Sequence, residues 1–300
     1  MKLSKLTVWM LAAASLALGS CSDDSFDGGK EEFASLSFSL STNNAISVGA
    51  ITRADGEATT ITMAEALGVE SFTQIDAGNF TIAITHPEDG EKYNGLLSAY
   101  SSEAVKLPIS AENYNVTANY GADNTVGFYG SGAPRYYGEK SFTITNAETK
   151  NEEINVSLAN SILKFNYTSS DAEGESEVNL FKNYFSDCDI TVTDQANNIV
   201  NYNNFETRGA FLEVGRQTIA YTLTVGQAQS NSSKTITGNV NVEVEANTCH
   251  IFKFNVTNIG GVNKLEIVID NSIATTHDIT VPDIDINDDG YIVNNGGENA

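Results

Sequence analysis

Three histidines and some close pairs of carboxylates are the residues of this sequence whose types could support catalysis. His86, His250 and His277 are far apart, and none has the spacing of a zinc site or a catalytic triad. Pairs such as Asp187 and Asp189 are expected by chance among 39 acidic residues. We therefore predict that the protein is not an enzyme, that it needs no cofactor, and that His250 is a hydrogen-bonded histidine near the core.

A calcium loop is the one metal site that the spacing indicates. Asp285, Asn287 and Asp289 would supply oxygen ligands at positions one, three and five, and Tyr291 a backbone carbonyl at position seven. Position twelve is a glycine instead of the bidentate glutamate, so the pattern predicts at most weak Ca²⁺ binding. A polar C-terminal tail explains the same residues, and both interpretations stay open.

Three tyrosines stand close together in one glycine-containing segment. Tyr129, Tyr136 and Tyr137 flank Arg135. Exposed rings at this place could stack on sugars, which makes the three tyrosines candidate glycan contacts. The rings could equally pack over one end of the fold and be held by their hydroxyl groups.

Cys21 has a thiol in a setting that predicts lipidation. Lys2 and Lys5 precede an apolar run from Leu6 to Leu18, and two small residues stand directly before Cys21. The run has secretory length and is too short to span a bilayer as a stable helix. The arrangement resembles a bacterial lipobox, in which the cysteine receives a diacylglycerol and the chain is cut just before it. An ordinary signal peptide is the alternative.

The residues after Cys21 bear on location. Ser22, Asp23 and Asp24 resemble the acidic tag that sends Bacteroidota lipoproteins to the outer face of the outer membrane. A solvated spacer is the other interpretation. Lipidation at Cys21 would anchor the protein to the membrane without spanning it. We expect a lipid-anchored outer-membrane protein at the cell surface.

Charge excludes one class of partner. Removal of residues 1–20 takes Lys2 and Lys5 away and changes the net charge from −23 to −25. Such a surface repels nucleic acid, so none is expected as a partner. The acidic residues are dispersed along the chain, which is typical of a soluble surface.

Alternation of apolar and polar residues with a period of two dominates the sequence after residue 32. This pattern is typical of strands with one buried and one solvated face, and we interpret it as antiparallel pairing. The clearest alternating segments are 36–40, 80–84, 114–120, 154–158, 163–167, 219–225, 240–244, 252–256 and 265–269. Two short helical stretches are expected, at 60–67 and at 176–185.

The predicted fold is all-β, with two tandem antiparallel β-sandwiches after a lipoprotein signal peptide. The boundary is placed at Asn160-Ser161, where one set of strands ends and the next begins. One elongated domain is the alternative. The expected segments are a signal peptide at 1–20, an acidic flexible tether at 21–32, sandwiches at 33–160 and 161–282, and an Asp/Asn-rich tail at 283–300.

Cys188 and Cys249 remain after Cys21. An exported compartment would permit a disulfide between them, and two separate buried thiols are the alternative. Cys188 shares strand parity with Ile190 and Val192, whereas Cys249 has the parity opposite to Phe252, so the flanking pattern favours neither.

Several segments in a fixed order resemble the fimbrillin-like surface lipoproteins of Bacteroidota, in particular a family known only as a domain of unknown function. The resemblance covers most of residues 33–170, and the rest matches by strand pattern alone. The segments that carry it are Phe80-Thr81-Ile82-Ala83-Ile84, Tyr114-Asn115-Val116-Thr117-Ala118-Asn119-Tyr120-Gly121, Gly127-Phe128, Pro134, Tyr136-Tyr137-Gly138 and Leu158-Ala159-Asn160-Ser161.

The resemblance implies two tandem transthyretin-like sandwiches and a role in fimbriae or surface adhesion. In fimbrial subunits of this kind, an arginine-specific protease cuts after the first strand, and a neighbour's strand fills the groove that opens. Here Arg53 follows the strand at Leu36–Leu40, in a segment rich in Gly and Ala. An exposed loop arginine without a role explains the same residue.

Three functional hypotheses follow. The first is a lipid-anchored fimbrillin-like protein that acts in adhesion or assembly, with other fimbrial subunits as partners. The second is a surface lipoprotein that presents the tyrosines to host or polysaccharide glycans. The third is a surface accessory of an enzyme, with no chemistry of its own.

Overall fold

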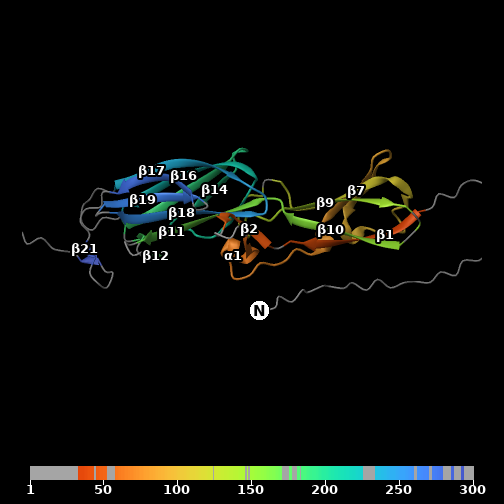
Figure 1. Ribbon diagram of the computed structural model, residues 1–300, viewed down its shortest axis with the longest axis horizontal. Helices are drawn as coiled ribbons and strands as arrows, with labels where there is room; N and C mark the ends of the chain where they lie inside the picture. Colours follow the sequence, from red (N-terminus) through yellow and green to blue (C-terminus); the bar gives the residue numbers. More distant parts are fainter. Residues whose placement is uncertain are drawn as a thin grey trace, which may run out of the picture. The chain divides into compact units, whose positions relative to one another are not determined.

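The molecule is described by a computed structural model, and strands dominate it (Figure 1). The residues that it describes are 33–43, 45–52, 58–123, 125–145, 147, 149–170, 176–177, 181–182, 184–225, 234–259, 262–269, 272–279, 285–286 and 292–293. The predicted all-β class is confirmed. Within this part of the chain, no helix is long and apolar enough to cross a membrane.

Seven strands form the first sheet, in the order β5-β4-β7-β9-β10-β1-β6. Their bounds are β1 Phe33–Thr42, β4 Thr81–His86, β5 Gly90–Leu96, β6 Leu107–Pro108, β7 Ser110–Tyr120, β9 Tyr136–Ile144 and β10 Thr149–Leu158. Short 3₁₀ turns at Ala77–Asn79 and Leu97–Ala99 flank β4 and β5. Strands β9 and β10 pair only where Tyr136 and Tyr137 meet Leu158 and Ser157.

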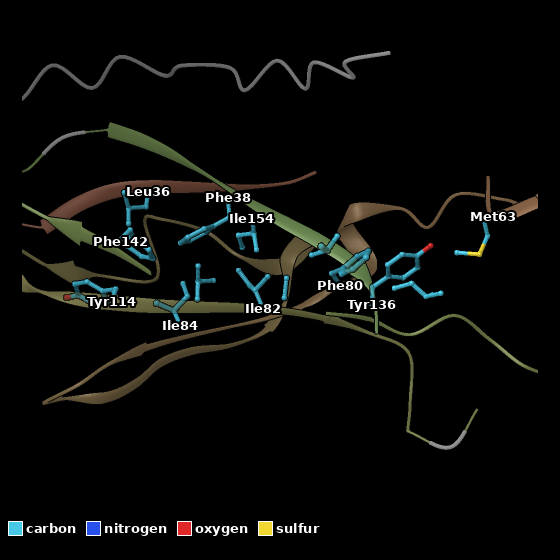
Figure 2. Close-up of a cluster of buried hydrophobic side chains, with 14 of the residues drawn as sticks. Leu36, Phe38, Met63, Phe80, Ile82, Ile84, Tyr114, Tyr136, Phe142 and Ile154 are labelled. Atoms are coloured by element: carbon cyan, nitrogen blue, oxygen red, sulfur yellow. The ribbon is translucent and has the colours of Figure 1, made fainter. Parts of the chain in front are cut away.

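Among the described residues, β9 and β10 are not paired beyond this short contact, and the buried side chains of all the longer strands except β5 gather in one core. Figure 2 shows Phe38 of β1 and Ile154 of β10 pointing toward Ile82 and Ile84 of β4. The alternation found in the sequence is borne out at these positions, since the apolar members of each strand are the buried ones. Phe38 meets Phe142 edge to face, with ring centroids 5.9 Å apart, a favourable aromatic geometry.

The predicted antiparallel pairing is wrong at three places, because the sheets are mixed. Strand β1 runs parallel to β10 from Ser35 and Thr149 to Thr42 and Val156. Strand β11 is likewise parallel to β18, and β18 to β2. Alternation reports which face of a strand is buried and says nothing of its neighbour's direction.

The remaining described strands form two larger sheets and one short pair. The nine-stranded sheet runs β20-β19-β18-β11-β15-β8, with β12 on β11 and β2 and β3 beyond β18; the four-stranded sheet runs β14-β13-β16-β17, and β21 pairs with β22. Their bounds are β2 Ala45–Thr52, β3 Ala58–Thr62, β8 Gly127–Phe128, β11 Ser161–Ser170, β12 Ser176–Glu177, β13 Phe185–Asp194, β14 Ile199–Tyr202, β15 Ala210–Leu212, β16 Gly215–Val225, β17 Lys234–Val244, β18 Thr248–Ile259, β19 Val262–Ile269, β20 Ser272–Ile279, β21 Asp285–Ile286 and β22 Ile292–Val293.

A second core lies between the inner faces of the nine-stranded and four-stranded sheets. Phe165 of β11 is fully buried at its centre, with ring centroids 4.5 Å from Tyr202 and 5.4 Å from Phe252. The Tyr202 hydroxyl donates to the Leu163 carbonyl at 2.8 Å, which satisfies the one polar atom of that ring. The second core is thus built on aromatic contacts.

The first predicted helical stretch is a helix, whereas the second begins with strand β12 at Ser176–Glu177 and ends where β13 begins at Phe185. Helix α1 spans Met63–Leu67, and Thr62 and Glu65 form a capping box at its start. Gly68 ends the helix with φ +67°, a conformation that glycine adopts without strain. In the second stretch, Phe181, Lys182 and Tyr184 are helical.

The chain passes from β10 to β11 at Asn160-Ser161, and the first residues of β11 contribute to both cores, Ile162 to the first and Leu163 to the second. The Asn160 side chain donates to the Ala133 carbonyl and accepts from the Arg135 amide, and its backbone carbonyl accepts from Asn247. The Ser161 hydroxyl donates to the Thr248 carbonyl. These buried polar groups are satisfied across the junction. The division into two sandwich domains stays a prediction.

Candidate functional site

Eight residues that the sequence singled out lie outside the part of the chain that the structure describes. These residues are Cys21, Ser22, Asp23, Asp24, Arg53, Asn287, Asp289 and Tyr291. Asp285 begins β21, which pairs with β22. The lipidation, cleavage and calcium hypotheses therefore stay predictions.

The setting of Arg53 differs from the sequence prediction in one respect. Strand β2, which ends at Thr52, lies between the first strand and Arg53. It pairs with β18 at Ser47 and Val48 and with β3 from Ala45 onward. The sequence predicts no strand here, because the alternation of Ile46 and Val48 with Ser47 is short and is followed by Gly49 and Ala50.

The histidines that can be described have structural surroundings. His250 is buried, as predicted, and its Nε2 accepts a hydrogen bond of 3.1 Å from the Glu245 amide. His86 is buried at the end of β4, with Nε2 3.0 Å from the Ser110 hydroxyl and its ring 4.7 Å from that of Tyr114. Each imidazole therefore helps to satisfy a local polar group.

The three candidate tyrosines are placed in three different environments. Tyr136 is only 2% exposed and contacts Phe80 in the first core, where burial raises the pKa of its hydroxyl to about 12. Because Tyr136 takes the inward position of β9, its ring face is not available for a glycan to stack on, although the residue borders the surface pocket described next. Tyr129 is 38% exposed and packs on Phe72, with ring centroids 5.3 Å apart. Tyr137 is 42% exposed and faces outward.

Tyr137 lies in the wall of an open surface pocket of about 650 Å³. Strands β7, β9 and β10 and the loops between them supply most of the wall, and Ala246, after β17, completes it. The polar and aromatic residues of the lining are Asn119, Tyr120, Asp123, Arg135, Tyr136, Tyr137 and Ser157. Tyr137 is recognisable from the sequence, whereas Asn119 and Asp123 carry no signal there, because nothing in the sequence shows that β7 lies beside β9.

Arg135 organises one side of this pocket. Its guanidinium makes ion pairs with Asp123 at 2.6 Å and with Glu213 at 3.1 Å. Asp123 follows β7 and Glu213 follows β15, so one side chain ties the seven-stranded sheet to the nine-stranded sheet. The fork of donors on a guanidinium suits such a double contact with carboxylates.

A second group of charges lies on β9 and β10. Glu152 is buried at an inward position of β10, and both its carboxylate oxygens lie 2.6 Å from lysine ammonium groups, those of Lys140 and Lys150. Burial acts to raise the pKa of Glu152, but the hydrogen bonds from the two lysines outweigh it and lower that pKa. A carboxylate that stays ionised between two lysines can join the strands that carry them through ion pairs. It is unsuited to general acid catalysis, which needs a protonated carboxyl group.

Cys188 and Cys249 are both buried thiols, one in each core, and form no disulfide. Burial raises the pKa of Cys188 to about 12. Burial therefore disfavours the thiolate, which is the reactive form of a cysteine. In the described part of the chain, no three His, Cys, Asp or Glu residues gather in a way that could hold a metal ion.

A family model matches residues 32–283, and its description is a domain of unknown function, DUF4493. The chain belongs to this family. Membership of a family of unknown function, predicted from the order of the motifs, is therefore confirmed. No match was found among proteins of curated function.

Some solved structures are similar to this DUF4493 chain. One is a fimbrial assembly protein from Parabacteroides distasonis, with 10% identity, a TM-score of 0.40, and coverage of 68% of this chain and 91% of that one. Another, from Bacteroides eggerthii, is provisionally described as a cell adhesion protein, with 9% identity, a TM-score of 0.36, and coverage of 76% and 86%. A third, from Bacteroides thetaiotaomicron, is provisionally described as polysaccharide-binding, with 10% identity, a TM-score of 0.35, and coverage of 82% and 98%.

The segments on which the resemblance rested have structural roles in this DUF4493 protein. Phe80–Ile84 supplies three fully buried side chains around β4, and Tyr114–Tyr120 is most of β7. Leu158–Ser161 carries the chain from β10 to β11. These motifs thus contribute to the core and the strands, and they do not indicate what the protein binds.

Proposed function

We propose that this DUF4493 protein is a lipid-anchored cell-surface protein that acts in adhesion or fimbrial assembly through protein contacts. The lipobox around Cys21 supports the anchor, and the strongly acidic chain is suited to a soluble surface. The resemblance to fimbrillin-like lipoproteins supports the role. The observation that carries the proposal is the position of β1 in its sheet.

Strand β1 is placed where a strand of another molecule could replace it. It pairs with β10 over eight residues, but on its other side it meets β6 only at Phe33 and Ala34. Its inward side chains Ala34, Leu36 and Phe38 are buried in the first core. Loss of β1 would leave an open strand edge beside an apolar groove, the acceptor that strand addition requires.

The anchor is tested by labelling. Cells that express the full chain are grown with an alkyne-tagged fatty acid. Labelled protein is expected in the membrane fraction, because the thiol of Cys21 would carry the diacylglycerol. A Cys21→Ser variant is expected to be unlabelled. Label that persists in this variant, or unlabelled wild-type protein in the medium, would contradict lipidation at Cys21.

The assembly role is tested with an arginine-specific protease. The sequence holds four arginines: Arg53, Arg135, Arg208 and Arg216. Arg135 is held in two ion pairs and Arg216 lies within β16, so cleavage is expected first at Arg53. Cut protein is expected to form higher oligomers, measured by intact mass and size-exclusion chromatography.

A matched pair of variants identifies the cut that matters. Arg208 is exposed between β14 and β15 and is the main competing site. Arg53→Lys should stay monomeric after treatment, whereas Arg208→Lys should oligomerise as the wild type does. Oligomers from Arg53→Lys, or a wild type that is cut at Arg53 and stays monomeric, would refute assembly by exchange of β1.

A further inference from the structure

We propose that the pocket beside Tyr137 binds an uncharged oligosaccharide. This role goes beyond assembly and does not rest on it, because the pocket is formed by β7, β9 and β10 and uses no atom of β1. The inference is carried by three features of the pocket: a fixed aromatic wall, exposed hydrogen-bonding groups, and an excess of carboxylates in and beside it.

The aromatic wall is held in place by its own hydrogen bond. The Tyr137 hydroxyl donates to a carboxylate oxygen of Glu139 at 2.7 Å, and this bond raises the pKa of the hydroxyl, so the ring stays neutral. Tyr137 is nonetheless 42% exposed. Tyr120 lines the same pocket, and its ring packs on Phe80 with centroids 5.4 Å apart. A ring fixed before binding loses little conformational entropy when a ligand stacks on it.

Hydrogen-bonding groups surround this wall. Asn119 is the register partner of Tyr137 on the neighbouring strand, and it is exposed. Asp123 is bonded to Arg135 through one oxygen only, and its side chain is 84% exposed. Ser157 lies opposite Tyr137 on β10. An amide, a carboxylate oxygen and a hydroxyl beside an apolar ring face complement the hydroxyl edge and the C–H face of a sugar.

The local charge decides which kind of sugar fits. Arg135 is the one cation in the lining, and Asp123 and Glu213 both pair with it. Glu139 adds a third carboxylate beside the ring. Within the lining itself, Asp123 balances Arg135, and Glu139 and Glu213 lie just outside it. With these two neighbours included, carboxylates outnumber the guanidinium by three to one, so a uronic acid or a sulfated sugar would be disfavoured. A volume of about 650 Å³ lies within the range of small-molecule sites and is sufficient for a short oligosaccharide.

The test is native affinity electrophoresis of the intact protein in gels that contain galactomannan, dextran, xyloglucan or polygalacturonate. We expect at least one of the three neutral polysaccharides to retard the wild type, and polygalacturonate to leave it unretarded. Tyr137→Ala is expected to lower the affinity at least about tenfold. Tyr129→Ala is the matched control, because Tyr129 is equally exposed but lies outside the pocket, and it should bind as the wild type does.

Each other outcome refutes the site. Retardation by none of the three neutral polysaccharides would do so, as would retardation by polygalacturonate or an equal loss in Tyr129→Ala. Thermal midpoints of both variants close to the wild type show that the loss is not unfolding. Oligomerisation after protease treatment is measured on the same Tyr137→Ala protein, so failure of sugar binding and failure of assembly are distinguished. A Tyr137→Ala variant that blocks oligomerisation would assign the pocket to a protein partner instead.

Discussion

Replacement of Phe165 by alanine is expected to lower the free energy of unfolding by about 4 kcal/mol. Phe165 is fully buried. The rings of Tyr202, Phe252 and Phe254 surround it, with centroids 4.5 to 6.2 Å from its own. Truncation removes the ring from the centre of these contacts. Because the neighbouring rings are held by two sheets, they can close the cavity only in part.

Urea unfolding followed by far-UV circular dichroism measures this loss. Tryptophan fluorescence does not serve, because the only tryptophan is Trp9, in the segment predicted to be removed. Ile199→Ala is the control, since that side chain is 57% exposed and its loss should cost less than about 0.5 kcal/mol. A Phe165→Ala variant as stable as this control would show that the two sheets do not share the core described.

Replacement of Gly138 by alanine is expected to cost about 3 kcal/mol, the upper part of the range for overpacking. Gly138 lies on β9 beside the short contact with β10. A Cβ at this position would meet the Asn155 carbonyl and would lie 2.8 Å from a methyl carbon of Val156. The nearest obstacle is backbone, so the two strands would have to separate.

The same urea unfolding measurement tests this prediction against a second glycine. Gly130 has φ +105° and open space where a Cβ would lie. Gly130→Ala therefore carries the strain of the backbone conformation without a clash, a cost of about 1 kcal/mol. Equal losses in the two variants would contradict the close approach of β9 and β10.

The site illustrates how far local sequence reasoning reaches. The exposure of Tyr137 and the burial of Tyr136 follow from their neighbouring positions on one strand, because successive side chains point to opposite faces. This parity separates the two tyrosines only once their segment is known to be a strand, so the sequence alone groups Tyr136 with Tyr137. Asn119 could be assigned to the pocket only once β7 and β9 were known to pair with Asn119 opposite Tyr137.

The sequence by itself determined the all-β class, the buried face of each clear strand and membership of a family of unknown function. It could do so because side-chain parity and motif order are properties of neighbouring residues. Only the tertiary structure decided that β1 runs parallel to β10, and that Arg135 joins Asp123 to Glu213. These contacts join segments far apart in the chain. The backbone hydrogen bonds between two strands form whatever side chains the strands carry. The residues of one strand therefore do not show which strand pairs with it or in which direction.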